Sequence, residues 1–386
     1  MSGRRRVTGS KRIVYLTGTR ADFGLMLPTL RAIDQSPRLE LRLIVTGMHL
    51  SDRFGRTERE VRASGLAVER TIPVPIDDDS GHGMGLSTGL ITCGVADYLA
   101  ENCCEALLLL GDRGEMLGAA TAALFADVPI VHVAGGDRSG SVDESIRHSI
   151  SKLAHIHCVS NDDSRQRLIR MGEDPDRIFD VGAPGLVGLV APDRATAVTV
   201  RNRYGVKDDE PFVLLLFHPV VQQAAEAGVQ WRAIFDALAE HPFRCVALMP
   251  NADHGTTAIR NEIESMQDAG RLTMIDHVPR ADYLALLAEC RFLIGNSSSG
   301  IVEAATFGTP VVNVGERQAG RLRSANVFDA PPESDAIGRA IRKAITFDPQ
   351  GLRNVYGEPH ADVRICEILE KTDFSDPALR MKINSY

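Results

Sequence analysis

The feature that most constrains this chain is a rhythm of short apolar runs separated by longer amphipathic stretches. Uninterrupted apolar runs are typical of parallel strands that are covered on both faces. The rhythm is broken by Gly and Pro at 182–185 and by a polar linker, and it restarts after Pro211. The expected strands are Arg12–Thr17, Glu40–Thr46, Ala106–Leu110, Ile130–Val133, Ile156–Val159, Phe212–Phe217, Arg244–Met249, Thr273–Ile275, Phe292–Ile294 and Val311–Val314.

Helix-like stretches lie between these runs, at Gly24–Asp34, Glu115–Ala126 and Arg280–Ala288. Strands that alternate with helices predict an α/β fold with parallel sheets, and the restart predicts two Rossmann-like domains facing a cleft. A chain of 386 residues is long enough for two cores. We therefore divide it into an N-terminal domain, 1–185, and a C-terminal domain, 186–386, whose last helices are expected to pack back on the first.

The overall charge disfavours some classes of partner. The chain has 51 acidic and 43 basic residues, whereas a nucleic-acid binder is expected to be basic. No apolar run approaches the roughly 20 residues that a membrane span requires. The basic start has no signal-peptide pattern, and the seven cysteines are scattered. We expect a cytoplasmic protein with neither a membrane nor a nucleic acid as its partner.

Three expected strand ends in the first half carry charged residues beside glycine. Arg20 lies in the segment 17–24, where helix N-terminal amides and a guanidinium could receive a phosphate. Asp112 and Arg113 follow Gly111 in the same way. For both segments, a capped helix start with a solvated arginine is an equally good interpretation.

The third strand end is richer in acids. Asp137 follows Gly135-Gly136, and Asp143 and Glu144 come next, so three carboxylates lie within eight residues. Neighbouring carboxylates can have separated pKa values and divide the roles of acid and base. Arg147, four residues after Asp143, shares its helix face. An acidic helix N-terminus explains Asp143 and Glu144 but not the Gly-Gly-Asp turn.

The second half offers candidates for binding a nucleotide. His218 ends an apolar strand and could contact a phosphate or move a proton, although a lone histidine is more often structural. Asn251 ends the next strand, where a simple turn is the alternative. The segment 295–300 places Ser297 and Ser298 between two glycines, which suits a diphosphate better than a helix cap alone. Glu303 follows one turn later.

Several familiar signatures are missing. No GxGxxG follows a strand, and neither a P-loop nor HExxH occurs. The acids at 77–79 precede His82, and we interpret 77–83 as a solvent-facing loop in preference to a metal site. We expect no cofactor and no metal.

Taken together, the motifs resemble a known family, the hydrolysing UDP-N-acetylglucosamine 2-epimerases of sialic acid and legionaminic acid biosynthesis. The likeness runs from about Arg12 to about Ile345. The motifs that carry it are Gly18–Asp22, Thr46–Leu50, Gly111–Arg113, Gly135–Asp137, Ser139-Gly140, Asp143–His155, His218-Pro219, Gly295–Ser298, Arg317-Gln318 and Gly320-Arg321. The resemblance implies a glycosyltransferase-B-like fold and a homodimer or homotetramer.

The resemblance also implies roles for individual residues. The implied catalytic residues are Asp112, Asp137, Asp143, Glu144 and His218. The implied nucleotide-binding residues are Arg20, Arg113, His218, Asn251, Val278, Ser297, Ser298, Glu303 and Arg317. The family commonly has Glu where this chain has Asp137, which draws that carboxylate back by about one bond length, on the scale at which misplaced groups lose rate.

The implied reaction converts UDP-N-acetylglucosamine into N-acetylmannosamine and UDP through a glycal. Three alternatives stay open from the sequence. One is the same reaction on a 2,4-diacetamido-2,4,6-trideoxy sugar nucleotide, because relatives of that kind share the stretch Asp143–His155. The others are a glycosyltransferase of the same fold and a sugar-nucleotide sensor without activity.

Overall fold

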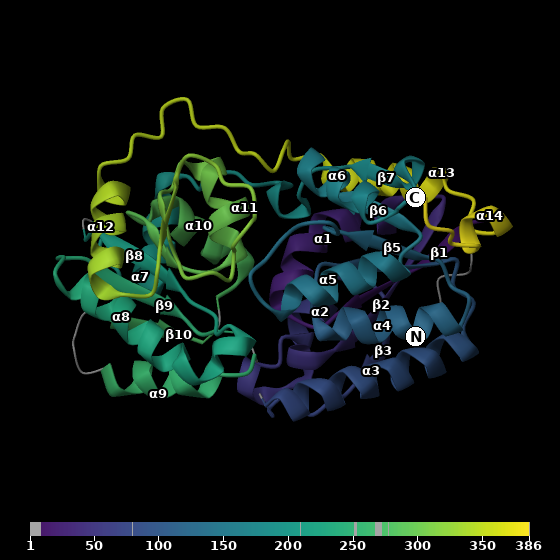
Figure 1. Cartoon of the computed structure of the whole chain (residues 1–386), viewed down its shortest axis with the longest axis horizontal. Coiled ribbons are helices and arrows are strands. Elements are labelled where there is room, and N and C mark those ends of the chain that lie inside the picture. Colours follow the sequence, from purple (N-terminus) through teal and green to yellow (C-terminus); the bar gives the residue numbers. More distant parts are fainter. Residues whose placement is uncertain are drawn as a thin grey trace.

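A computed structural model describes residues 9–78, 80–208, 210–250, 253–266, 272–276 and 278–385. Two parallel sheets organise these residues, and Figure 1 shows them beside one another. The first sheet has the order β3-β2-β1-β4-β5-β6-β7 and the second the order β10-β9-β8-β11-β12-β13. The strands of the first are β1 (Lys11–Thr17), β2 (Leu39–Thr46), β3 (Val68–Ile72), β4 (Ala106–Leu110), β5 (Ile130–Val133), β6 (Ile156–Val159) and β7 (Ile178–Asp180).

The strands of the second sheet are β8 (Phe212–Leu216), β9 (Arg244–Leu248), β10 (Leu272–Ile275), β11 (Leu293–Gly295), β12 (Val311–Val314) and β13 (Val327–Ala330). In each sheet the chain order reverses at one place, between β1 and β4 and between β8 and β11. Ligands of such sheets bind beyond the carboxyl ends of the strands at the reversal. The predicted pair of Rossmann-like sheets is confirmed.

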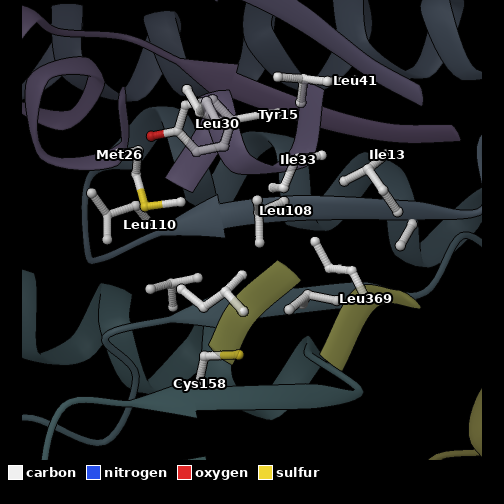
Figure 2. Packing of buried hydrophobic residues seen from close by; sticks show 14 of the residues in the cluster. Ile13, Tyr15, Met26, Leu30, Ile33, Leu41, Leu108, Leu110, Cys158 and Leu369 are labelled. Carbon is white, nitrogen blue, oxygen red and sulfur yellow. The ribbon is translucent and has the colours of Figure 1, made fainter. Parts of the chain in front are cut away.

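Strand β4 shows why apolar runs form the centre of these sheets. All five of its residues are buried, and successive side chains point to opposite faces. Leu108 and Leu110 join the cluster shown in Figure 2, whereas Leu107 and Leu109 pack on the other face. A strand covered on both faces has no polar position, so its sequence reads ALLLL.

Helices cover both faces of the first sheet. Most of them lie within the first half of the chain, and the last two come from its end. They are α1 (Arg20–Gln35), α2 (Glu58–Ala63), α3 (Gly81–Glu101), α4 (Gly114–Phe125), α5 (Val142–Leu153), α6 (Asp162–Arg170), α13 (Ala361–Lys371) and α14 (Pro377–Arg380). Around the second sheet lie α7 (Arg194–Arg203), α8 (Ala227–Ala239), α9 (Thr256–Met266), α10 (Arg280–Glu289), α11 (Ser298–Val302) and α12 (Ser334–Ile345).

After α12 the chain crosses back to the first sheet, as Figure 1 shows. Leu369 of α13 and Leu379 of α14 are buried in the same cluster as Ile13 of β1 (Figure 2). The apolar face of α13 thus completes the core of the first sheet. The division at 185/186 remains our proposal for the domain boundary, with these last helices assigned to the first core.

The structure adds elements that the apolar rhythm did not predict. Strands β3, β7 and β13 are all at sheet edges, where partial exposure removes the continuous apolar run. The expectation of a loop over 77–83 is wrong at its end, because α3 begins at Gly81, with Ser80 as its N-cap, and takes in His82.

Candidate functional site

A cavity of about 310 Å³ lies where the carboxyl ends of the two sheets meet. Side chains from both sheets line it, which places the predicted residues of the two halves around one volume. The predicted residues on its wall are Arg20, Asp112, Arg113, Asp137, Asp143, His218, Val278, Ser297, Ser298, Glu303 and Arg317. Asn251 lies outside the described residues, and Glu144 is not part of the lining.

On the second sheet, the ends of β8 and β11 are tied together. The Asn296 side chain accepts a hydrogen bond from the His218 amide at 2.7 Å and donates to the His218 carbonyl at 2.8 Å. Gly295 adopts φ of 137°, and a Cβ there would lie 2.1 Å from the Leu216 carbonyl oxygen. Only glycine fits this approach. The serines that follow therefore start from a fixed backbone.

The His218 side chain is buried beside two guanidiniums. Burial first, and then Arg317 and Arg113, lower the pKa of His218 well below its usual value. The imidazole is neutral at pH 7 and presents one N–H donor and one acceptor. It can donate to a phosphate without adding charge.

Glu303 is held by a short chain of contacts that the sequence did not reveal. Arg280 lies 2.6 Å from its carboxylate and also donates to the Gly185 carbonyl at 2.9 Å. Ser299 donates to the same carboxylate, and Tyr283 donates to Ser299. The carboxylate is thereby oriented, and it lines the cavity at one end of α11.

The start of α1 has the capped arrangement that was the alternative to a phosphate site. The buried Asp22 carboxylate accepts from the Gly18 amide at 3.1 Å and the Thr19 amide at 2.7 Å. Burial raises the pKa of Asp22 to about 6, against the lowering effect of these hydrogen bonds. The Gly18 and Thr19 amides are therefore occupied by Asp22, and the Arg20 side chain lines the cavity beside them.

Arg113 is fixed by carboxylates from both halves of the chain. It lies 3.3 Å from Glu115 and 3.4 Å from Asp253. Burial alone would lower the pKa of Arg113, but these two carboxylates raise it above its usual value. The guanidinium is a permanent cation at the cavity wall.

The catalytic candidates of the first sheet are Asp112, Asp137 and Asp143. They lie near glycines at the strand ends, as predicted, and each has an arginine close by. The Asp143 carboxylate accepts a hydrogen bond from the Ser141 hydroxyl at 2.8 Å and lies 3.4 Å from Arg317, which belongs to the second sheet's side of the cavity. Asp112 contacts Arg147. Three carboxylates therefore share one cavity with cations between them, which is an arrangement suited to proton transfer beside an anionic leaving group.

Arg147 is the residue whose role the helix spacing misjudged. Its side chain is 1% exposed and points to Asp112, not to Asp143 one turn before it. It also donates to the Asp137 carbonyl and the Ser139 hydroxyl, both at 3.2 Å. Burial and the nearby Arg321 lower the pKa of Arg147, yet the usual value for arginine is so high that the group stays charged. It fixes the turn that carries the catalytic candidates.

Glu144 is not part of the cavity wall. Its carboxylate accepts from the Ser139 amide at 2.6 Å and lies 3.1 Å from the His148 ring nitrogen and 3.5 Å from the Arg147 guanidinium. These contacts fit the acidic helix start that was the alternative interpretation of this residue. The structure thus separates neighbouring acids, with Asp143 in the cavity and Glu144 supporting the loop before α5.

The described residues offer neither a metal site nor a membrane span. In the part of the chain that the structure describes, no three His, Cys, Asp or Glu side chains are grouped so that they could hold a metal ion. Among the same residues, every helix is too short or too polar to cross a bilayer.

Comparison with known proteins agrees with the geometry. The family model described as UDP-N-acetylglucosamine 2-epimerase matches residues 31–370. UDP-N,N'-diacetylbacillosamine 2-epimerase (hydrolyzing) of Legionella pneumophila is 39% identical, over 97% of this chain and all of that protein. UDP-N-acetylglucosamine 2-epimerase of Neisseria meningitidis is 35% identical, over 87% of this chain and 88% of that protein.

Solved structures show the same fold. The UDP-GlcNAc 2-epimerase from Neisseria meningitidis bound to UDP-GlcNAc superposes with a TM-score of 0.78, at 16% identity, over 94% of this chain and 100% of that one. The enzyme of Methanocaldococcus jannaschii in complex with UDP-GlcNAc and UDP gives a TM-score of 0.77 at 15% identity, over 93% and 99%.

Proposed function

The chain belongs to the UDP-N-acetylglucosamine 2-epimerase family and is a UDP-sugar 2-epimerase, and from this premise we propose that it is a hydrolysing one. In this reaction the configuration at C2 of a 2-acetamido sugar is inverted, and the free sugar and UDP are released. The observation that carries the proposal is that Asp112, Asp137 and Asp143 share one cavity with Ser297 and Ser298. Acids and bases thus lie beside a site suited to a diphosphate.

The chemistry explains why such a pairing is needed. The proton at C2 is only weakly acidic, but it becomes removable when the C1–O bond to the diphosphate breaks and positive charge develops at C1. The bond's electron pair leaves with UDP, and a carboxylate takes the C2 proton, which gives a glycal. Water then adds its hydroxyl to C1, while an acid on the other face delivers a proton to C2 and is recharged by the proton of that water. A base and an acid are required on opposite faces of the ring.

The second sheet is suited to the leaving group. We assign the diphosphate to Ser297, Ser298 and Arg317, with Arg20, Arg113 and neutral His218 completing the contacts. Donors that are fixed before the reaction stabilise the charge that develops on the departing phosphate. Glu303, held by Arg280, is assigned to the ribose hydroxyls. Asn251 and the backbone at Val278 are assigned to the remainder of the nucleoside.

For the sugar we propose a 2,4-diacetamido-2,4,6-trideoxy hexose in preference to N-acetylglucosamine. The relative that is 39% identical and covered in full is named for such a substrate, N,N'-diacetylbacillosamine, whereas the relative named for UDP-N-acetylglucosamine is 35% identical. Ala134, Ala183 and Pro184 also line the cavity, and an apolar wall suits a C6 methyl group better than a hydroxymethyl group.

The test is a competition between the two UDP-sugars without any acceptor. We expect UDP release from both, with the higher kcat/KM for the diacetamido sugar, and free sugar of inverted C2 configuration in the product. UDP release that depends on an added acceptor would identify a glycosyltransferase. Tight UDP binding without turnover of either sugar would identify a sensor.

Binding of UDP should raise the melting temperature, because a ligand that binds only the folded state stabilises it by about 2.7 kcal/mol at a hundred times its Kd. Ser298→Ala and Arg317→Ala should each reduce this shift, since both side chains line the cavity on the nucleotide side. Ser149→Ala, on the exposed face of α5, is the matched control. Equal UDP shifts in all three variants would contradict the assignment of the diphosphate site.

A further inference from the structure

Two loops from different sheets meet at the mouth of the cavity. One precedes α5 and includes Gly140, and the other follows β12 and includes Glu316 and Arg317. The Gly140 amide donates to the Arg317 carbonyl at 2.9 Å. A Cβ on residue 140 would lie 1.8 Å from the Glu316 carbonyl oxygen, so the backbones approach as closely as glycine alone permits.

This contact brings Arg321 to the carboxylates of the first sheet. The Arg321 Nε donates to the Arg138 carbonyl at 2.8 Å and lies 3.2 Å from the Asp137 carboxylate. Its Nη2 lies 3.9 Å from Asp112. The side chain is 10% exposed. One guanidinium from the second sheet is therefore shared between two carboxylates of the first.

The two carboxylates depend on Arg321 to different degrees. Asp112 has a second cation, because Arg147 contacts it directly. Among the described residues, Arg321 is the one cation within 4 Å of the Asp137 carboxylate, and Asp137 is 8% exposed. Without Arg321 the carboxylate would keep the hydrogen bond that it accepts from the Arg138 amide at 2.9 Å, but its second oxygen would have no cation beside it, and we expect the carboxylate to lose part of its orientation.

We propose that Arg321 is a positioning residue, which holds Asp137 and Asp112 in place for reaction and does so only while the loops around Gly140 and Glu316 are docked. The side chain of Asp137 is one carbon shorter than glutamate, and Arg321 orients its carboxylate from the opposite domain. The role in turnover rests on the proposed 2-epimerase reaction. The contact between Arg321 and the two carboxylates does not depend on that reaction, so the contact and the role in turnover can be tested separately.

The contact is tested by a double-mutant cycle of unfolding free energies, using Arg321→Gln, Asp137→Asn and the double variant. Residues in one ion pair are coupled, so the two single effects should not add. The same cycle with Glu101→Gln, which is paired to Arg70 of β3 and shares no contact with Arg321, should be additive. An additive result for Arg321 and Asp137 would overturn the proposal whether or not the protein is an epimerase.

The consequence for turnover is tested with Arg321→Gln, Arg321→Lys and the control Arg339→Gln. We expect Arg321→Gln to lower kcat roughly 10- to 100-fold, as displaced reacting groups do, with UDP affinity close to that of the parent. Arg321→Lys should recover part of the loss because it restores the charge. Arg339 is exposed on α12 and is not part of the cavity wall, so Arg339→Gln should keep parent turnover.

Equal kcat values for Arg321→Gln and the control Arg339→Gln would overturn the proposed role of Arg321. A loss of UDP affinity without a loss of kcat would do the same, because it would assign Arg321 to the nucleotide. An inactive parent with an intact double-mutant coupling would instead contradict the proposed function and leave the Arg321 contact established.

Discussion

Asp112→Asn and Asp143→Asn should each lower turnover by roughly 100-fold or more, the size of effect expected when a general acid or base is removed. Both carboxylates line the cavity, and asparagine keeps their size while it removes the proton chemistry. UDP affinity should change little, because the diphosphate is assigned to the second sheet. In Asp143→Asn it should not fall at all, since Arg317, 3.4 Å from Asp143, loses a competing carboxylate.

The measurement that isolates this effect is deuterium incorporation at C2 in deuterated water, followed together with turnover. Glu144→Gln is the matched control, because that carboxylate is the next residue along the chain but is not part of the cavity wall. We expect the control to keep most of its turnover. Parent-like turnover and deuterium incorporation in both Asp112→Asn and Asp143→Asn would show that these carboxylates do not carry the proton.

At Asp137 the informative substitution keeps the carboxylate and lengthens the side chain, whereas the substitutions above remove a carboxylate. Asp137→Glu restores the residue that is common in the resembling family and lengthens the side chain by one carbon. If Arg321 can shift to accommodate it, turnover should be retained or raised. A loss as large as that of Asp112→Asn would indicate that the contact of 3.2 Å with Arg321 is adjusted to the shorter acid.

The sequence was sufficient for the central strands because burial on both faces leaves a strong mark. The predicted ranges Ala106–Leu110, Ile130–Val133, Ile156–Val159 and Val311–Val314 agree with β4, β5, β6 and β12 at both ends. These strands lie inside their sheets, where most positions are apolar. Three of the four edge strands, β3, β7 and β13, escaped prediction because solvent on one side permits residues such as Glu69 and Arg70 in β3, whereas the edge strand β10 was predicted.

Helix α3 shows a second reason why an element can be missed when only the local sequence is considered. It contains Gly81, Gly83, Gly85, Gly89 and Gly94, and each glycine costs a helix about 1 kcal/mol relative to alanine. Local propensity therefore argues against it. Close contacts provide the reason for two of them, because a Cβ at Gly94 would lie 2.7 Å from the Ile72 side chain and one at Gly83 would lie 2.3 Å from the Asp78 carbonyl oxygen. The tertiary contact that compensates for a poor helix former cannot be seen in a window of sequence.

The ion pairs of the site could not be predicted from spacing. The helix repeat placed Arg147 beside the acids of its own helix, and it does lie 3.5 Å from Glu144, but its contact with Asp112, 35 residues away on another strand end, could not be predicted. Arg321 and Asp137 are 184 positions apart by their numbers, and only the meeting of two sheets brings them together. What sequence could predict was which strand ends carry charged residues. What it could not predict was which charges meet across the cleft.

Gly140→Ala should lower turnover by about 100-fold, the loss that a displacement of about 1 Å can cause, although the substitution adds only a methyl group. The new Cβ would lie 1.8 Å from the Glu316 carbonyl oxygen, so the loops must separate. Separation breaks the hydrogen bond from the Gly140 amide to the Arg317 carbonyl and withdraws Arg317 and Arg321 from their carboxylates. The backbone at 140 is not in the left-handed region, so the effect isolates this contact from backbone strain.

The control is Gly85→Ala on α3, where a Cβ meets nothing within 4 Å. It should leave turnover unchanged and stabilise the helix slightly, by up to about 1 kcal/mol. Gly140 is exposed, so the added methyl group displaces no core side chain, and Gly140→Ala should lower the melting temperature by about as much as Arg321→Gln does, while kcat falls and the UDP-dependent stabilisation weakens through Arg317. Parent-like kcat in Gly140→Ala would mean that the carboxylates act without the docked second-sheet loop. A loss of kcat and of UDP binding, in a protein that unfolds at about the temperature of Arg321→Gln, is the result expected if the contact between the loops assembles the site.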